Sequence, residues 1–272
     1  MTCYPAASKE EVEALKDYLM QMHKRKDLLI YLVISGLKAE HRNTILGYFW
    51  WLLDPLLGVL VYYFLVVIVL ERGGPDYPAF LVIGLVVFRW FRSTVGTSAK
   101  SVAGKSSIIT QVYLPKAIFP FAVSLTQTIN FVFGLGVIAI FLAYFRIIPG
   151  VEVAWLPFIM FIQIIFHLAI ALIMGYVCVF IRDIENVISY FMRFMRYASP
   201  VIWEGGRLPS EYQWIVQGNP FSHFLEAYRN VLMYNSLPNF TMLLLIGAIS
   251  LVIIIFMLYF YSQNEHKIIK VL

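Results

Sequence analysis

The sequence predicts an all-α protein that crosses a membrane several times. Of its 272 residues, 60% are hydrophobic and only 14% are charged, and the mean hydropathy is +0.76. A soluble domain would carry nearer to a quarter charged residues. Six apolar stretches have about the length that a helix needs to cross a hydrocarbon core, which is roughly 20 residues for about 30 Å. We therefore expect six transmembrane helices per chain.

The first apolar stretch, residues 45–70, follows a charged collar that contains Lys38 and Arg42. Basic residues beside a span are typical of its cytoplasmic end. Asp54 and Pro55 lie inside this stretch. The proline is expected to kink the helix, and a carboxylate at that depth is costly unless it faces protein or water.

The other five spans are predicted at residues 79–99, 118–145, 153–181, 187–203 and 241–261. If the N-terminus is inside, most lysines and arginines fall on the cytoplasmic side, which predicts that both termini are cytoplasmic. The same bias explains the net charge of +5 without nucleic-acid binding. Between spans five and six, residues 204–240 are half polar and interrupted by Gly and Pro, so we expect an external cap of short or re-entrant helices there.

Residues 8–24 are expected to form an amphipathic helix, since apolar residues recur at helical spacing. These are Val12, Leu15, Leu19 and Met22. The apolar run at 28–37 is too short to cross and is expected to lie at the membrane interface, although a helical hairpin packed on a partner also fits. Residues 1–40 are thus predicted to be a cytoplasmic interface region and residues 41–272 a transmembrane domain.

No enzyme motif is complete in this sequence. Gly104-Lys105-Ser106 resembles the end of a phosphate-binding loop, but Ala99 stands where that loop needs a glycine. The five histidines are isolated and the two cysteines are far apart, so neither a metal site nor a disulfide is predicted. His167 lies in an apolar stretch and is expected to be a hydrogen-bonded packing residue. We predict no catalytic residue and no cofactor of the chain's own.

Four arginines fall inside predicted spans: Arg89 and Arg92 in the second, and Arg193 and Arg196 in the fifth. At 1.5 Å per residue they lie about 12–20 Å from the ends at which their spans begin. A guanidinium at that depth should face protein or water. One interpretation is a path for an anionic substrate, whose phosphate oxygens pair with guanidinium groups. The other is pairing with Asp54 or with carbonyls at helix ends.

Aromatic residues gather in the first two predicted spans, and sugar rings stack on aromatic faces. Trp50, Trp51, Tyr62 and Trp90 are therefore candidates to line a substrate path together with the four arginines. Trp and Tyr near the ends of spans also serve as interface anchors, and this alternative stays open.

Five blocks of sequence follow one another along nearly the whole chain: RNTILGYFWWLLDPLL, PAFLVIGLVVFRWF, YLPKAIFPFAVSL, FIRDIENVISYFMRFMRYASPVIW and GNPFSHFLEAYRNVL. Each resembles a block of the permease subunits of ABC exporters for cell-surface polysaccharides and teichoic acids, and the order is the same. The resemblance implies a homodimeric permease in the bacterial cytoplasmic membrane. It also implies that two copies of a separate subunit bind ATP, and that the polymer is carried on an undecaprenyl-type lipid.

The resemblance further implies a cytoplasmic coupling segment between the second and third spans, which is residues 100–116 here. The residues expected to couple the chain to the ATPase are Lys105, Ser106, Gln111, Arg182 and Asp183. Many members of the family have uncharged residues where the four intramembrane arginines stand. Within the family the chain looks closest to the wall teichoic acid transporters, and our hypothesis is that four additional cations fit a phosphate-rich polymer better than a neutral glycan.

We therefore expect the membrane subunit of an ATP-driven exporter that flips or translocates a lipid-linked anionic polymer, teichoic acid. The alternative is the same machine carrying a neutral O-antigen or capsular polysaccharide. A stand-alone secondary transporter or a membrane transferase is an alternative of another class. A secondary transporter should show repeated halves with broken helices. A transferase should show a clustered acid, base or nucleophile. The sequence shows neither feature.

Overall fold

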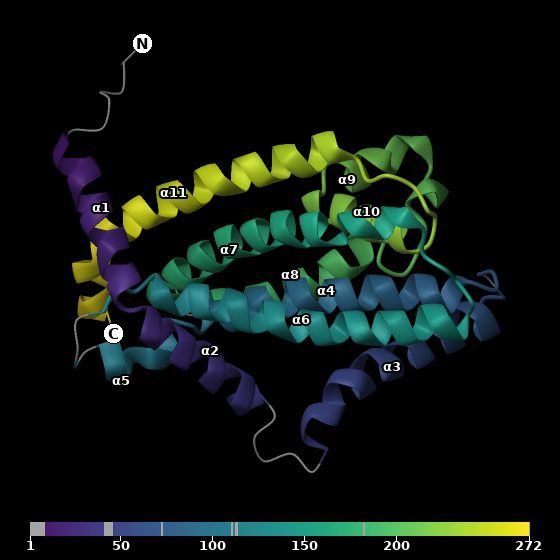
Figure 1. Ribbon diagram of the computed structural model, residues 1–272, viewed down its shortest axis with the longest axis horizontal. Coiled ribbons are helices and arrows are strands. Elements are labelled where there is room, and N and C mark those ends of the chain that lie inside the picture. The colour runs from purple at the N-terminus through teal and green to yellow at the C-terminus, as the bar shows by residue number, and fades with distance from the viewer. Residues whose placement is uncertain are drawn as a thin grey trace.

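The computed structural model describes residues 9–40, 46–71, 73–109, 111, 114–181 and 183–271. Within these residues all regular elements are helical and no strand occurs, which confirms the predicted all-α class. Figure 1 shows long helices lying side by side along the long axis of the molecule, with short helices at both ends.

Four long helices form the bundle: α4 (Tyr77–Ala99), α6 (Ile118–Tyr144), α7 (Leu156–Phe180) and α11 (Phe240–Val271). Each is long and apolar enough to cross a membrane, α7 together with the preceding turn η4 (Val151–Trp155). α4 contacts α6 and α7, and α7 contacts α11, so α4 and α7 lie in the middle of the bundle. These helices match four of the predicted spans.

A shorter apolar helix covers the first predicted span. α3 (Trp50–Tyr63) contains Pro55 and continues directly into a π-helical turn, η2 (Phe64–Val69). It packs on α4 and α6. The apolar helical stretch Leu53–Val69 is shorter than the four long helices.

The predicted fifth span is a shorter helix than expected. α8 (Ile184–Ala198) has 15 residues, or about 22 Å at 1.5 Å per residue, which is less than the hydrocarbon thickness of about 30 Å. It ends at Ser199, whose backbone is extended, because a proline, here Pro200, disfavours helical geometry in the residue before it. The count of six spans therefore stays a prediction.

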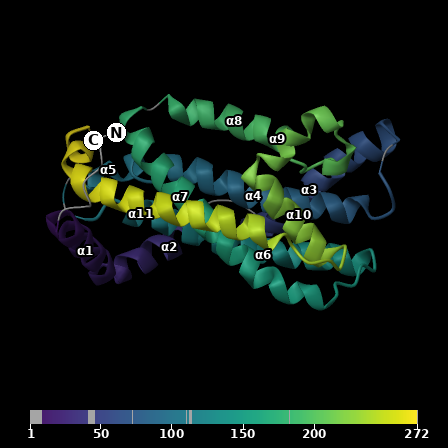
Figure 2. The ribbon, with the colours of Figure 1, turned by 90° about the horizontal axis from the view of Figure 1, so that it is seen from above.

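One end of the bundle, which we call the α1 end, gathers α1 (Lys9–Lys24), α2 (Lys26–Glu40), α5 (Ser106–Ile109) and the last turns of α11 (Figures 1 and 2). α2 packs on α6 and α1 packs on α11. Ile30, Tyr31 and Ile34 of α2 are exposed, as expected of a helix that lies against the bundle with an apolar outer side.

α1 buries a different residue from those predicted. Met22 packs against the core, but Leu19 is 44% exposed, whereas Tyr18 is 4% exposed. The Tyr18 hydroxyl accepts a hydrogen bond from the amide of Ala117 at 3.2 Å, and such a partner is what allows a tyrosine to be buried. Two further predicted positions, Val12 and Leu15, have side chains outside the described part of the chain.

The predicted sixth span also continues further than expected. α11 does not stop near Tyr261 before a basic tail but runs to Val271. Leu258, Tyr261, Glu265 and Ile268 are all buried, and they recur every three or four residues, which places them on one face of the helix. The tail is therefore part of the folded α1 end.

The opposite end, which we call the α10 end, holds the segment predicted as a cap (Figure 1). Its elements are η5 (Gly205–Arg207), η6 (Ser210–Tyr212), α9 (Gln213–Gln217) and α10 (Pro220–Leu232). The side chain of Asn219 caps α10 by accepting a hydrogen bond from the amide of Phe221 at 3.0 Å. α10 packs on α4, α7 and α11.

Candidate functional site

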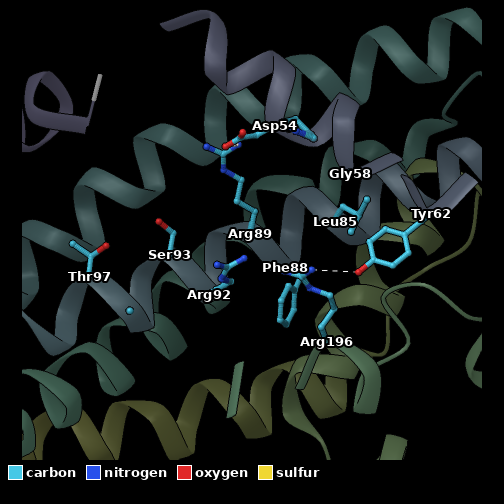
Figure 3. Close-up of a pocket in the computed structure, with 12 residues that line it drawn as sticks. Asp54, Gly58, Tyr62, Leu85, Phe88, Arg89, Arg92, Ser93, Thr97 and Arg196 are labelled. Carbon is cyan, nitrogen blue, oxygen red and sulfur yellow. Dashed lines mark hydrogen bonds and ion pairs between the residues drawn. The ribbon is translucent and has the colours of Figure 1, made fainter. Parts of the chain in front are cut away.

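A cavity of about 510 Å³ lies between α3, α4 and α8 (Figure 3). The side chains from α4 recur every three or four residues, so one face of this helix forms a wall of the cavity. The lining residues are Asp54, Pro55, Gly58 and Tyr62 of α3, Leu85, Phe88, Arg89, Arg92, Ser93, Gly96 and Thr97 of α4, and Arg196 of α8.

The cavity is positively charged. Arg89, Arg92 and Arg196 line it, and Asp54 is the one carboxylate among the described lining residues, so three cations and one anion give a net charge of +2. Arg89 Nη1 lies 2.9 Å from Asp54 Oδ2, with the two side chains 36% and 49% exposed. Arg89 thus pairs with Asp54 and also faces the same cavity as Arg92 and Arg196. That this cavity is a path for an anionic substrate stays a prediction.

Arg196 of α8 contacts both of the other helices at the cavity. Its Nη1 donates a hydrogen bond to the Tyr62 hydroxyl at 3.2 Å, which Figure 3 shows as a dashed line. Its Cζ lies 5.4 Å from the centre of the Phe88 ring, within the range of a cation–π contact. Two of the predicted site residues, Arg196 of α8 and Tyr62 of α3, are thus in direct contact.

Sequence reasoning missed the polar wall next to these arginines. Ser93 and Thr97 follow Arg89 at intervals of four residues and line the same cavity. A polar residue at every fourth position inside an apolar span is a readable signal, because it marks one face of a helix.

Other predicted site residues do not line this cavity. Trp90 is 2% exposed and stacks on Phe131, with 4.1 Å between ring centres, in the core of the bundle. Arg193 is exposed on α8, where its Cζ lies 5.5 Å from the centre of the Tyr190 ring. Trp50 is half-buried at the start of α3. The side chain of Trp51 lies outside the described part of the chain.

His167 packs as predicted. It is fully buried, its ring stacks with Phe91 at 5.6 Å between centres, and its Nε2 lies 3.4 Å from Gln163 Nε2. Among the described residues, no group of three or more His, Cys, Asp or Glu side chains could hold a metal ion.

The predicted coupling residues that the structure describes lie near the α1 end. Lys105 ends the turn η3 (Ala103–Lys105) and Ser106 begins α5. Lys105, Gln111 and Asp183 are exposed. Arg182 falls outside the described residues.

An ion pair connects the two parts of the predicted coupling region. Lys100 Nζ lies 3.3 Å from Glu185 Oε2, which joins the start of the 100–116 segment to the first turn of α8. The lysine side chain is 69% exposed, and such a pair contributes little stability. It nevertheless shows that the segment and the turn before α8 are neighbours.

The family model for the ABC-2 type transporter matches residues 28–233. The chain belongs to the ABC-2 type transporter family. The match contains α3, α4 and α8, and therefore every element of the cavity. As a member of this family, the chain is a multi-pass membrane component of a transporter.

Similar proteins cover nearly the same length as this ABC-2 type transporter. Two O-antigen export system permease proteins RfbA of Klebsiella pneumoniae are 26% identical over 247 residues, which are 90% of this chain and 95% of each relative. A protein of the same name from Myxococcus xanthus is 28% identical over 236 residues, covering 86% of this chain and 91% of the relative.

Proposed function

We propose that this ABC-2 type transporter is the membrane subunit of an ATP-driven exporter for a lipid-linked cell-surface polysaccharide of the O-antigen class. Support comes from the names of the three relatives, which align over most of their length. None of these names refers to teichoic acid. The relatives therefore favour the alternative of an O-antigen polysaccharide over our first expectation.

The energy for transport would come from an ATP-binding partner subunit, two copies of which would bind a homodimer of this chain. The exposed side chains of Lys105, Gln111 and Asp183 near the α1 end support a docking surface there. Because an ATP-binding subunit would dock from the cytoplasm, the α1 end would face the cytoplasm and the α10 end would face outward.

The observation that carries the transport mechanism is the charged cavity between α3, α4 and α8. Its volume of about 510 Å³ is typical of a small-molecule site, so it would hold a lipid headgroup with one or two sugars rather than a whole polymer. Guanidinium groups bind phosphate oxygens with two parallel hydrogen bonds. The cavity would thus hold the phosphate of the lipid carrier during transport.

A second candidate substrate is an anionic polymer such as teichoic acid. The observation that favours it is the excess of arginine over carboxylate in the cavity. A neutral polysaccharide would present anionic groups only at its lipid carrier, whereas a phosphate-rich polymer would present them in every repeat.

Arg196→Gln tests the cavity, and Arg193→Gln is its matched control on the same helix. Arg196 lines the cavity, and Arg193 does not. Hydrogen bonds to charged groups contribute about 1.5–3 kcal/mol, so losing one guanidinium should reduce export about 10-fold or more. The measurement is the amount of polymer at the surface of cells that depend on this chain. Equal export by the two variants would show that the cavity is not on the substrate path.

The same two variants distinguish the substrates when each is tested with a neutral polymer and with a phosphate-rich polymer on the same carrier lipid. A role limited to the carrier predicts the same loss with both polymers, whereas an anionic path predicts a larger loss with the phosphate-rich one. Export by the purified chain in liposomes without an ATPase would refute the ABC exporter assignment.

A further inference from the structure

At the α1 end, a buried ion pair joins the last residue of the 100–116 segment to α11. Lys116 Nζ lies 3.2 Å from Glu265 Oε2, and the two side chains are 0% and 5% exposed. The backbone amide of Lys116 donates a second hydrogen bond, of 2.9 Å, to Glu265 Oε1. One carboxylate therefore holds both the backbone and the side chain of the same residue.

Tyr18 of α1 completes this cluster. Its hydroxyl accepts a hydrogen bond from the amide of Ala117 at 3.2 Å. Burial raises the pKa of Tyr18 well above its usual value, and the charge of Glu265 and a hydrogen bond to it raise the pKa further. The hydroxyl is thus protonated at neutral pH and donates a hydrogen bond to the carboxylate of Glu265. Three elements distant in sequence meet at one acidic side chain.

The 100–116 segment has a fastened side and an exposed side. Val102, Ile109 and Leu114 are buried in the same apolar cluster as Tyr261 and Ile268 of α11. In contrast, Ile108 is 41% exposed, and Lys105 and Gln111 are exposed too. A partner that binds the exposed side would push on a segment whose inner side is attached to α11.

A continuous chain of contacts leads from this cluster into the bundle. The Tyr261 hydroxyl donates a hydrogen bond of 3.1 Å to the carbonyl of Leu172, which connects α11 to α7. A Cβ on Gly175 of α7 would lie 2.6 Å from Pro120 Cγ, so α6 and α7 approach closely at the same level. α7 packs on α4, whose other face lines the cavity.

We propose that Lys116 and Glu265 are positioning residues that fix the 100–116 segment to α11, so that the two move as one body when a partner pushes on the segment. Burying two charges is costly unless both are fully paired, and breaking one partner leaves the other charge unpaired. An apolar contact could slide, whereas this paired carboxylate defines a single register between the segment and the helix. The coupling role rests on the proposed function, but the rigid attachment does not.

The attachment is tested on the full-length chain by pulsed electron–electron double resonance, which measures the distance between two spin labels. The labels are placed on exposed residues, Ser107→Cys on the segment and Lys270→Cys on α11, in a background with Cys3→Ser and Cys178→Ala. We expect one narrow distance distribution in the parent and a broad one in Glu265→Gln. Lys267→Gln is the matched control, because Lys267 is exposed on the same helix, and it should keep the narrow distribution.

A second pair of labels, Arg146→Cys and Leu237→Cys, reports on the α10 end, where both residues are exposed. Its distance distribution should not change in Glu265→Gln. Broadening at both ends would mean that the ion pair supports the fold as a whole, and an unchanged distribution at the α1 end would mean that it fixes nothing. Either result overturns the proposal.

The coupling role is tested separately in proteoliposomes that contain the chain and its ATP-binding partner. Glu265→Gln should lower export per ATP hydrolysed, while ATP hydrolysis itself continues and Lys267→Gln behaves as the parent. Unchanged export per ATP with a broadened distance distribution would overturn the coupling role. If no ATPase binds the chain, the proposed function fails, and the label distances still test the attachment.

Discussion

Replacing Arg229 by methionine should destabilise the α10 end. Arg229 is 4% exposed, and its guanidinium donates hydrogen bonds to the carbonyls of Pro200, Val201 and Phe80, the last two at 2.9 and 3.4 Å. Its Cζ also lies 3.4 Å from the centre of the Phe80 ring. One side chain of α10 thus joins the residues that follow α8 to the first turn of α4.

The magnitude follows from these bonds. Two short bonds from a charged donor are worth about 3–6 kcal/mol together. Methionine fills a similar volume and removes the cost of burying a guanidinium, which offsets part of the loss. We expect a net decrease of about 2–4 kcal/mol in the free energy of unfolding, which corresponds to a Tm lower by about 4–16 °C for a chain of this size.

The assay is thermal unfolding of the purified chain in detergent, followed by circular dichroism. Arg146→Met is the matched control, because Arg146 is exposed in the loop after α6, and its Tm should stay within about 2 °C of the parent. Hydrogen exchange near Val201 should increase in Arg229→Met alone. A Tm change of equal size in the two variants would refute the role of the buried guanidinium.

Two further predictions concern other close contacts. Asp54→Asn should change the Tm by less than about 3 °C, because the pair that Asp54 forms with Arg89 is more than a third exposed and exposed pairs contribute at most about 1 kcal/mol; a larger shift in the same unfolding assay would contradict this. Gly175→Ala should lower the free energy of unfolding by about 1–3 kcal/mol through its contact with Pro120. Gly136→Ala is the control and should be neutral or slightly stabilising, because its Cβ would meet nothing within 4 Å. Equal Tm values for the two variants would refute the steric reasoning.

The long helices could be predicted from the sequence because apolar runs of this length have one stable form in a membrane. α4 and α6 begin and end within two residues of the predicted spans 79–99 and 118–145. The ends of elements were harder to predict. α8 ends before Pro200. The extension of α11 beyond Tyr261 has the composition of a solvated tail, although the helical spacing of its apolar residues could have revealed it.

Some of the residues that line the cavity could be selected from the sequence. Arg89, Arg92 and Arg196 could be selected because a cation inside an apolar span requires a polar surrounding, and all three line one cavity. Arg193 satisfies the same criterion but is exposed. Its position three residues before Arg196 places both on neighbouring parts of α8, and only the packing of α8 on α4 decides which of the two faces inward.

The same reasoning explains why Glu265 and Arg229 were missed. Both stand in segments that composition assigns to polar surface, and hydropathy contains no information on the hydrogen-bond partners of a side chain. What permits their burial is geometry: Glu265 receives two hydrogen bonds from Lys116, and Arg229 finds three carbonyls. Burial of a charge is tolerated where it is paired or hydrogen-bonded, and these bonds join elements far apart in sequence. A charged residue in a polar segment is therefore as much a candidate for a structural role as one inside a span.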